Sequence, residues 1–94
     1  MGKAEGLVER KLVDAVRAKG GLCEKWTAGT AGWPDRIVLF FDGKLGFVET
    51  KAKGKKPRRL QIYRHSQLRK LGFKVYVLDE VKDIERIIDE ICST

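Results

Sequence analysis

The chain has 94 residues, of which 43% are hydrophobic and 35% are charged, and its formal net charge is +7. This length suits one domain spanning residues 1–94, near the lower limit for a core without disulfides or structural metals. No apolar run approaches the ~20 residues of a membrane span, and the N-terminus lacks the hydrophobic region of a signal peptide. We therefore expect a soluble, cytoplasmic protein.

Basic residues are in excess, with 20 Lys and Arg against 13 Asp and Glu. Such a surplus favours a polyanionic partner, because contacts with phosphates release condensed counterions. Charge alone does not separate this interpretation from a cationic surface that only maintains solubility.

Cysteine and histidine are too scarce to predict a disulfide framework or a metal site of their own. Cys23 and Cys92 are far apart in the sequence, and we interpret both as buried apolar residues. The single histidine, His65, argues against a histidine-based metal cluster.

The first part of the chain predicts a helix, a short strand and a loop. Residues 4–19 have helical spacing, and two glycines follow them, a signal that ends a helix. Residues 22–26 suit a short strand. The Gly- and Thr-rich segment 27–32 is typical of a flexible loop.

Two strands joined by a tight turn are expected next. Residues 37–41 form a continuous run of β-branched and aromatic side chains, which suits a buried strand. Asp42 and Gly43 predict a hairpin turn, and residues 45–52 return as the partner strand.

The rest of the chain predicts a basic loop, a helix, a strand and a final helix. The loop covers residues 53–59, the helix 60–71 and the strand 73–78. Asp79 can cap the last helix, whose apolar stripe consists of Ile84, Ile87, Ile88 and Ile91. The order α-β-β-β-α-β-α predicts an α/β domain with a small mixed sheet. Strands 45–52 and 73–78 should be parallel, joined by a right-handed crossover.

An acid, any residue and a lysine recur four times, as Glu9–Lys11, Asp42–Lys44, Glu49–Lys51 and Glu80–Lys82. Only Glu49 and Lys51 lie within a predicted strand, where alternation puts both side chains on one face and Thr50 on the other. The hairpin brings Asp35, which follows Pro34, to the same end of the sheet. Two carboxylates and an ammonium group placed together suit a divalent cation and a phosphodiester. The alternative is a cross-strand ion pair of little consequence.

Two further helices contribute polar candidates. Helical projection places Glu9 and Glu5 on the apolar stripe of the first helix, and Glu9 is our first choice for a third carboxylate. Glu5 is the alternative, or it only favours the positive end of the helix dipole. Gln61 lies at the edge of the stripe of the second helix, where spacing alone indicates an ordinary boundary residue.

The spacing of Gly32, Pro34, Asp35, Glu49 and Lys51 resembles the PD-(D/E)xK nuclease motif. The early helix with Glu9 and four short runs narrow the resemblance to the VRR-NUC domain, over roughly residues 4–79. These runs are WPDR at 33–36, FVETK at 47–51, LQ at 60–61 and LGFKVYV at 71–77. The resemblance implies a restriction-endonuclease-like αβββαβ core with a small mixed sheet flanked by helices, here followed by a C-terminal helix. It also implies hydrolysis of DNA phosphodiesters with Mg²⁺ or Mn²⁺.

The resemblance assigns roles to individual residues. It implies that the catalytic residues are Asp35, Glu49, Lys51 and Gln61, and that the metal ligands are Glu9, Asp35, Glu49 and the carbonyl of Thr50. Lys51 would orient the attacking water or stabilise charge in the transition state. Stand-alone members resemble Holliday-junction resolvases in being homodimers, so a homodimer is expected. The isoleucine stripe would either contribute to that interface or, as we favour, cover the sheet.

Basic residues around the motif are candidates for contacts with phosphates rather than bases. They are Arg36, Lys53, Lys55, Lys56, Arg58, Arg59 and Arg64, with Arg69 and Lys70 further along the second helix. We expect a metal-dependent DNA endonuclease, structure-specific or nicking, that acts in DNA repair, recombination or phage DNA processing. The alternatives are a non-catalytic basic DNA-binding module and a subunit of a larger nuclease complex.

Overall fold

The computed structural model describes residues 3–93, with side chains described from residue 6 onward. The helices and strands follow one another in the predicted order. Their bounds are α1 Lys3–Ala18, β1 Leu22–Lys25, β2 Arg36–Leu39, η1 Phe41–Gly43, β3 Leu45–Thr50, α2 Arg59–Lys70, β4 Lys74–Leu78, η2 Val81–Asp83 and α3 Ile84–Cys92, where η1 and η2 are short 3-10 helices.

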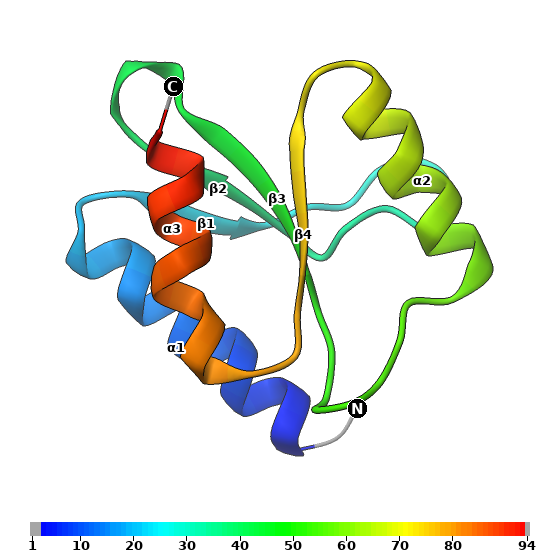
Figure 1. Ribbon diagram of the computed structural model, residues 1–94, viewed down its shortest axis with the longest axis horizontal. Coiled ribbons are helices and arrows are strands. Elements are labelled where there is room, and N and C mark those ends of the chain that lie inside the picture. Colours follow the sequence, from blue (N-terminus) through cyan, green and yellow to red (C-terminus); the bar gives the residue numbers. More distant parts are fainter. Residues whose placement is uncertain (1–2, 94) are drawn as a thin grey trace.

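The four strands form one mixed sheet in the order β1-β2-β3-β4 (Figure 1). The pairs β1–β2 and β2–β3 are antiparallel, whereas β3 and β4 are parallel. The parallel pairing confirms the predicted connection through α2. Because β3 has a neighbour on each side, its register is fixed, and each of its side chains is held to one face of the sheet.

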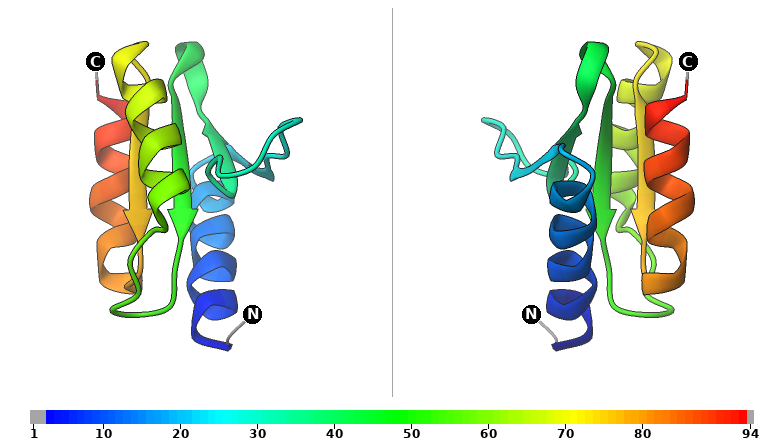
Figure 2. Two further views of the ribbon diagram at one scale, coloured as in Figure 1. Left: turned by 90° about the vertical axis from the view of Figure 1, so that its right-hand side faces the viewer. Right: turned by 90° about the vertical axis from the view of Figure 1, so that its left-hand side faces the viewer.

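Helices cover both faces of the sheet (Figure 2). On one face, α1 and α3 pack over the larger core, which consists of Val8, Leu12, Val16, Cys23, Val38, Val48, Leu78 and the four isoleucines of α3. On the other face, α2 covers a smaller core of Phe47, Leu68 and Val75, with Trp26 and Trp33 at its margin. The isoleucine stripe therefore covers the sheet, and its burial leaves it unavailable for a dimer interface.

The turn between β2 and β3 is centred on Asp42 and Gly43, as predicted. Both have positive φ angles, 61° and 72°, a conformation that glycine adopts readily and aspartate more readily than most residues. The Lys44 amide donates to the Phe41 carbonyl at 3.3 Å and closes the turn. Since residues 40–44 make this turn, β2 ends two residues earlier than the apolar run predicts.

Two predictions near the C-terminus are wrong. Asp79 does not cap the last helix, because η2 lies between them and the Asp79 carboxylate accepts a hydrogen bond from the Gly54 amide at 3.1 Å. Cys92 is exposed, whereas Cys23 is buried as predicted. Cys92 directly follows Ile91 on α3, and neighbouring helix positions point about 100° apart, so it lies off the buried stripe.

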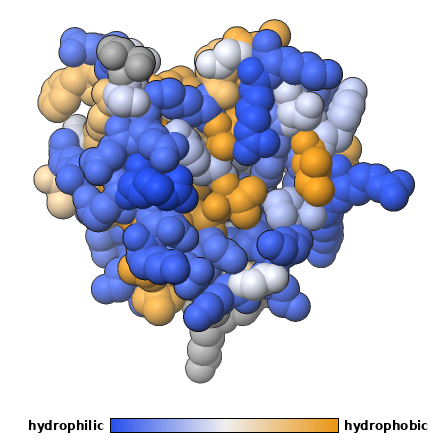
Figure 3. Space-filling model, in the orientation of Figure 1, coloured by the Kyte–Doolittle hydropathy of each residue, from blue (hydrophilic) through white to orange (hydrophobic). Residues whose placement is uncertain are grey.

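Hydrophilic side chains cover most of the face shown in Figure 3, and hydrophobic side chains appear there in separate patches. Several exposed large apolar residues belong to α2 or follow it directly, namely Leu60, Ile62, Tyr63 and Leu71. No helix within residues 3–93 is long and apolar enough to cross a membrane.

Candidate active site

The hairpin brings Asp35 and Glu49 together. Arg36, the first residue of β2, pairs with Val48, so the residue before it, Asp35, lies beside Glu49 at the end of β3. The Asp35 carbonyl accepts a hydrogen bond from the Trp26 amide at 3.0 Å, which ties this position to the end of β1. Two backbone connections therefore fix the start of β2 next to the strand that carries Glu49 and Lys51.

Glu49 is the centre of the site and is only 1% exposed. Its Oε2 accepts a hydrogen bond from Gln61 Nε2 at 3.0 Å and lies 3.7 Å from Lys51 Nζ. Its Oε1 lies 3.4 Å from His65 Nε2. Protein groups thus contact both oxygens, and the carboxylate has little freedom to rotate.

The surroundings of Glu49 make its ionisation unfavourable. Burial raises the pKa of the Glu49 carboxyl above its usual value, and the nearby charge of Asp35 raises it as well. The hydrogen bond with His65 and the charge of Lys51 act in the opposite direction without cancelling the rise. A positive charge between two carboxylates this close would offset their repulsion and favour the ionised form of both.

Asp35 is held through one of its two carboxylate oxygens. Its Oδ2 accepts hydrogen bonds from the Thr50 amide at 2.9 Å and from the Thr50 hydroxyl at 3.1 Å. Although alternation turns Thr50 away from Glu49, its side chain still belongs to the site through Asp35. Both Thr50 bonds end on Oδ2, so Asp35 Oδ1 is the freer oxygen.

The carbonyl of Thr50 lies where the β2–β3 ladder is interrupted by proline. The pairing of Arg36 with Val48, continued two residues further, places Pro34 opposite Thr50. Proline has no amide hydrogen and cannot donate to that carbonyl. The local sequence therefore leaves both the Thr50 carbonyl and one Asp35 oxygen available at the same end of the sheet.

Gln61 connects the site to the beginning of α2. Its side-chain oxygen accepts a hydrogen bond from the Arg58 amide at 2.8 Å, while its side-chain nitrogen donates to Glu49. The first of these bonds satisfies an amide that the helix start would otherwise leave unpaired. Gln61 is therefore more than a boundary residue, because the start of α2 fixes the direction of its amide.

His65 is the site residue that the sequence did not predict. It is 2% exposed and faces Glu49 from α2, one helical turn after Gln61. Residues four apart share a helix face, so the position of Gln61 was the signal that could have pointed to His65. Taken from the sequence alone, a single histidine argues only against a histidine-based metal cluster.

Glu9 is paired with Arg36 and shares a cavity with Asp35. The Arg36 guanidinium donates to Glu9 Oε2 at 2.8 Å and to the Cys23 carbonyl at 3.2 Å. Glu9 and Asp35 also line one cavity of ≈ 240 Å³, together with Lys25, Trp26, Thr27, Trp33 and Pro34. The first helix thus places Glu9 at the site, while the side chain of Glu5 lies outside the described residues.

Arg64 fastens the loop before Asp35 to α2. Its guanidinium donates to the Ala31 carbonyl and to Gln67 Oε1, each at 3.0 Å, and lies 4.6 Å from the centre of the Trp33 ring. Gly32 of this loop packs against α2, where a Cβ would come within 2.6 Å of Leu60. Its φ of +93° also favours glycine at this position. The protein contacts of Arg64 therefore join the segment that carries Asp35 to the helix that carries Gln61.

The basic candidates of residues 53–59 extend from the end of β3 to the first residue of α2. Lys55, Lys56, Arg58 and Arg59 are exposed, and Lys53 is exposed with a loose contact of 3.8 Å to Glu80. Since this segment follows Lys51 directly, a cluster of exposed positive charges borders the carboxylates. This arrangement is suited to contact with an extended anion such as a nucleic acid backbone.

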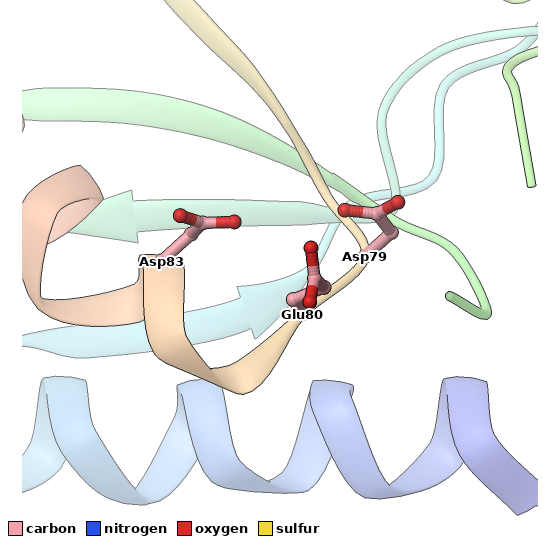
Figure 4. A group of neighbouring side chains, drawn as sticks. All are labelled: Asp79, Glu80 and Asp83. Atoms are coloured by element: carbon pink, nitrogen blue, oxygen red, sulfur yellow. The ribbon is translucent and has the colours of Figure 1, made fainter. Parts of the chain in front are cut away.

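A second group of acids, Asp79, Glu80 and Asp83, lies after β4 (Figure 4). One oxygen from each lies within 4.8 Å of the others. Asp79 already accepts the Gly54 amide, and Glu80 lies 3.8 Å from Lys53 and 3.9 Å from Lys82. All three side chains are partly exposed, so their proximity does not by itself indicate a site.

Comparisons with known proteins extend over nearly the whole chain. No family model matches the sequence. A curated protein named "Putative nuclease p44", from Acyrthosiphon pisum secondary endosymbiont phage 1, is 42% identical over 85 residues, covering 89% of this chain and 90% of that protein. A solved structure described as "VRR_NUC domain" has a TM-score of 0.86 and 32% identity, covering 94% of this chain and 97% of that one.

Proposed function

Because the chain belongs to the VRR-NUC family of nuclease domains, we propose that it is a metal-dependent DNA endonuclease acting at Asp35, Glu49 and Lys51. The observation that carries this proposal is the burial of the Glu49 carboxylate among Lys51, Gln61 and His65, with Asp35 beside it. A buried carboxylate with so many fixed partners is unfavourable for stability alone and is typical of a functional site.

The available donors fit a hard divalent cation. Asp35 Oδ1 and the Thr50 carbonyl are the freer oxygens, Glu49 lies next to them, and Glu9 shares a cavity with Asp35. We propose these four as the oxygen ligands of Mg²⁺ or Mn²⁺, which prefer carboxylate and carbonyl oxygen. His65 is directed at Glu49 instead, so a zinc-type nitrogen ligand is not part of the proposal.

When bound, such a cation lowers the pKa of a coordinated water and offsets negative charge on the phosphate. Lys51, with a side chain 16% exposed, supplies a fixed positive charge where the phosphorus centre gains negative charge. Gln61 holds Glu49 in position, and Thr50 holds Asp35. The chain itself therefore contributes orientation and charge rather than a covalent intermediate.

The same proposal covers substrate and assembly. The exposed basic residues 53–59 are suited to holding the DNA backbone beside Lys51, whereas Arg36 and Arg64 act mainly through protein contacts. We propose cleavage of branched, nicked or duplex DNA by a homodimer in the cytoplasm, in phage DNA processing or DNA repair. Light scattering of the purified chain tests the homodimer.

A cleavage panel tests the activity. Single-stranded, duplex, flap, four-way junction and supercoiled DNA are each incubated with the chain in Mg²⁺, Mn²⁺ or EDTA. We expect cleavage of at least one DNA form with a divalent cation and none in EDTA, and loss of cleavage in Asp35→Ala, Glu49→Ala and Lys51→Ala. Full activity in any of these variants would contradict the assignment. Binding without cleavage in either metal would favour a DNA-binding module, and activity only with a partner protein would favour a subunit of a larger complex.

A further inference from the structure

A second basic surface lies on the α1 side of the carboxylates. A groove of ≈ 480 Å³ runs beside α1, and its charged lining consists of Arg10, Arg17, Lys25, Arg36, Glu9 and Asp14. Residue spacing alone does not connect α1 with DNA, because the basic residues of this helix are interspersed with acidic ones. Only the fold brings Lys25 of β1 next to the arginines of α1.

The charge that this groove presents outward is positive. Arg36 and Glu9 neutralise each other through their 2.8 Å contact. Arg10, Arg17 and Lys25 are exposed, and they form no ion pair within residues 6–93. Among the described side chains of the lining, Asp14 is the one remaining acid, so three exposed cations face a single carboxylate.

The groove is continuous with the proposed active site. Glu9 and Lys25 line both the groove and the cavity that contains Asp35. The basic segment 53–59 begins two residues after Lys51 and leads to α2, which covers the face of the sheet opposite to α1. A strand that passes over Asp35 therefore meets positive charge in both directions.

The spacing of the two arginines suits a nucleic acid backbone. Arg10 and Arg17 are seven residues apart on α1, which is about 10.5 Å along the helix axis at 1.5 Å per residue. Each DNA strand carries one phosphate charge per nucleotide, so two guanidinium groups at this separation can contact separate phosphates of one backbone. Guanidinium groups bind phosphate oxygens in a bidentate manner and read no base sequence.

We propose that the groove lined by Arg10, Arg17 and Lys25 binds the DNA backbone on the side of the cleaved phosphate opposite to residues 53–59. This inference rests on the proposed function and adds the path of the substrate to it. The path places α1 along the DNA and makes binding dependent on charges far from Lys51 in the sequence.

Salt-dependent binding tests the path. Dissociation constants for a short fluorescein-labelled duplex and for a four-way junction are measured in EDTA over a range of salt concentrations. We expect Arg10→Gln combined with Arg17→Gln to weaken binding and to reduce the slope of log K against log salt by about 1–2, since each phosphate contact contributes about 0.9. With Mg²⁺ or Mn²⁺, KM should rise while cleavage at saturating DNA remains near the wild-type rate.

The matched control removes the same charge elsewhere. Lys44→Gln combined with Arg86→Gln changes the β2–β3 turn and α3 and should leave the slope as in the wild type. A slope that is unchanged in the Arg10 and Arg17 variant, or reduced equally in both variants, would overturn the groove assignment while cleavage by the wild type stood. A wild type that neither binds nor cleaves any DNA would instead overturn the proposed function. Equal melting temperatures of the variants and the wild type establish that each variant is folded.

Discussion

Two acidic clusters in this domain contain the same short pattern and differ in their surroundings. Glu49 with Lys51 and Glu80 with Lys82 both have the acid-x-Lys spacing, and their ion pairs measure 3.7 Å and 3.9 Å. The Glu49 side chain is 1% exposed and that of Lys51 16%, whereas Glu80 is 31% and Lys82 73% exposed. Charge and distance therefore do not distinguish the two pairs, but burial does.

Burial changes what such a pair can do. A pair exposed to water is screened and contributes about 0–1 kcal/mol to stability. In a buried site the same charges interact more strongly and keep their geometry, since side chains such as Gln61 and His65 fix the carboxylate. Burial and fixed geometry therefore support the proposal that the Glu49 cluster is the catalytic one, while the cluster at Glu80 resembles an ordinary charged surface.

The largest effect separating the clusters should be on DNA cleavage. Glu49→Gln combined with Lys51→Met should reduce the cleavage rate at least 10²–10³-fold, roughly the loss on removing one preorganised charge-stabilising group. Glu80→Gln combined with Lys82→Met, the same changes at the same spacing, should leave the rate near wild type. The rates are compared on whichever DNA form the wild type cleaves. Comparable losses in both variants would remove the distinction drawn from burial.

Stabilisation by a divalent cation should separate the clusters next. A ligand present at about 100 times its Kd stabilises the folded state by about 2.7 kcal/mol, so the melting temperature of the wild type should rise with Mn²⁺. Asp35→Asn combined with Glu49→Gln should abolish this rise. Neutralising Asp79, Glu80 and Asp83 as Asn, Gln and Asn should preserve it, and the opposite pattern would assign the cation to the exposed cluster.

Arg64 provides a test of how the buried cluster is held in place. Arg64→Met removes two hydrogen bonds and the contact with Trp33, which together contribute about 1–3 kcal/mol to the free energy of unfolding. We expect lower stability, a slower rate at saturating DNA and an unchanged salt dependence of binding. Arg59→Met, on the exposed side of the same helix, should instead reduce the salt dependence and leave stability unchanged. If Arg64→Met behaves like Arg59→Met, Arg64 acts on DNA phosphates.

The smallest expected effect is on the pH dependence of stability in the absence of a divalent cation. The pKa of Glu49 is raised in the folded state above the ordinary 4.5, mainly by burial. The stability linked to its protonated form is therefore present below pH 4.5 and is lost as the pH rises through the folded pKa. Glu49→Gln in EDTA should melt at a higher temperature than the wild type at neutral pH, and the difference should shrink toward pH 4. Glu80→Gln serves as the exposed control, and a lower melting temperature for Glu49→Gln would contradict this account.

The sequence predicted those parts of the site that depend on local rules. A tight turn at Asp42 and Gly43 and the period of two in the next strand were enough to bring Asp35 near Glu49 and Lys51. The helical projection of α1 likewise predicted that Glu9 faces the sheet, and in the structure Glu9 contacts Arg36 of β2. These relations depend on periodicity and turn geometry, which can be read from neighbouring residues.

Contacts between distant elements could not be predicted in this way. His65 meets Glu49 only because α2 packs across β3, and Arg64 meets Ala31 only because the loop before Asp35 lies along that helix. Asp79 was expected to cap a helix, but the nearby Gly54 amide became its partner. In each case the packing of distant elements determines which groups meet, and residue spacing along the chain does not predict that packing.

The contact of Gly46 with α3 determines where this domain can be cut. A side chain at Gly46 in β3 would meet Ile91 at 2.7 Å, so the helix rests directly on the backbone of the central strand. A fragment that stops after β4 would expose Val48 and Leu78, both now fully buried. The C-terminal helix is therefore part of the folding unit rather than an appendage to the αβββαβ core. A transferable module for fusions or truncations has to extend through Cys92.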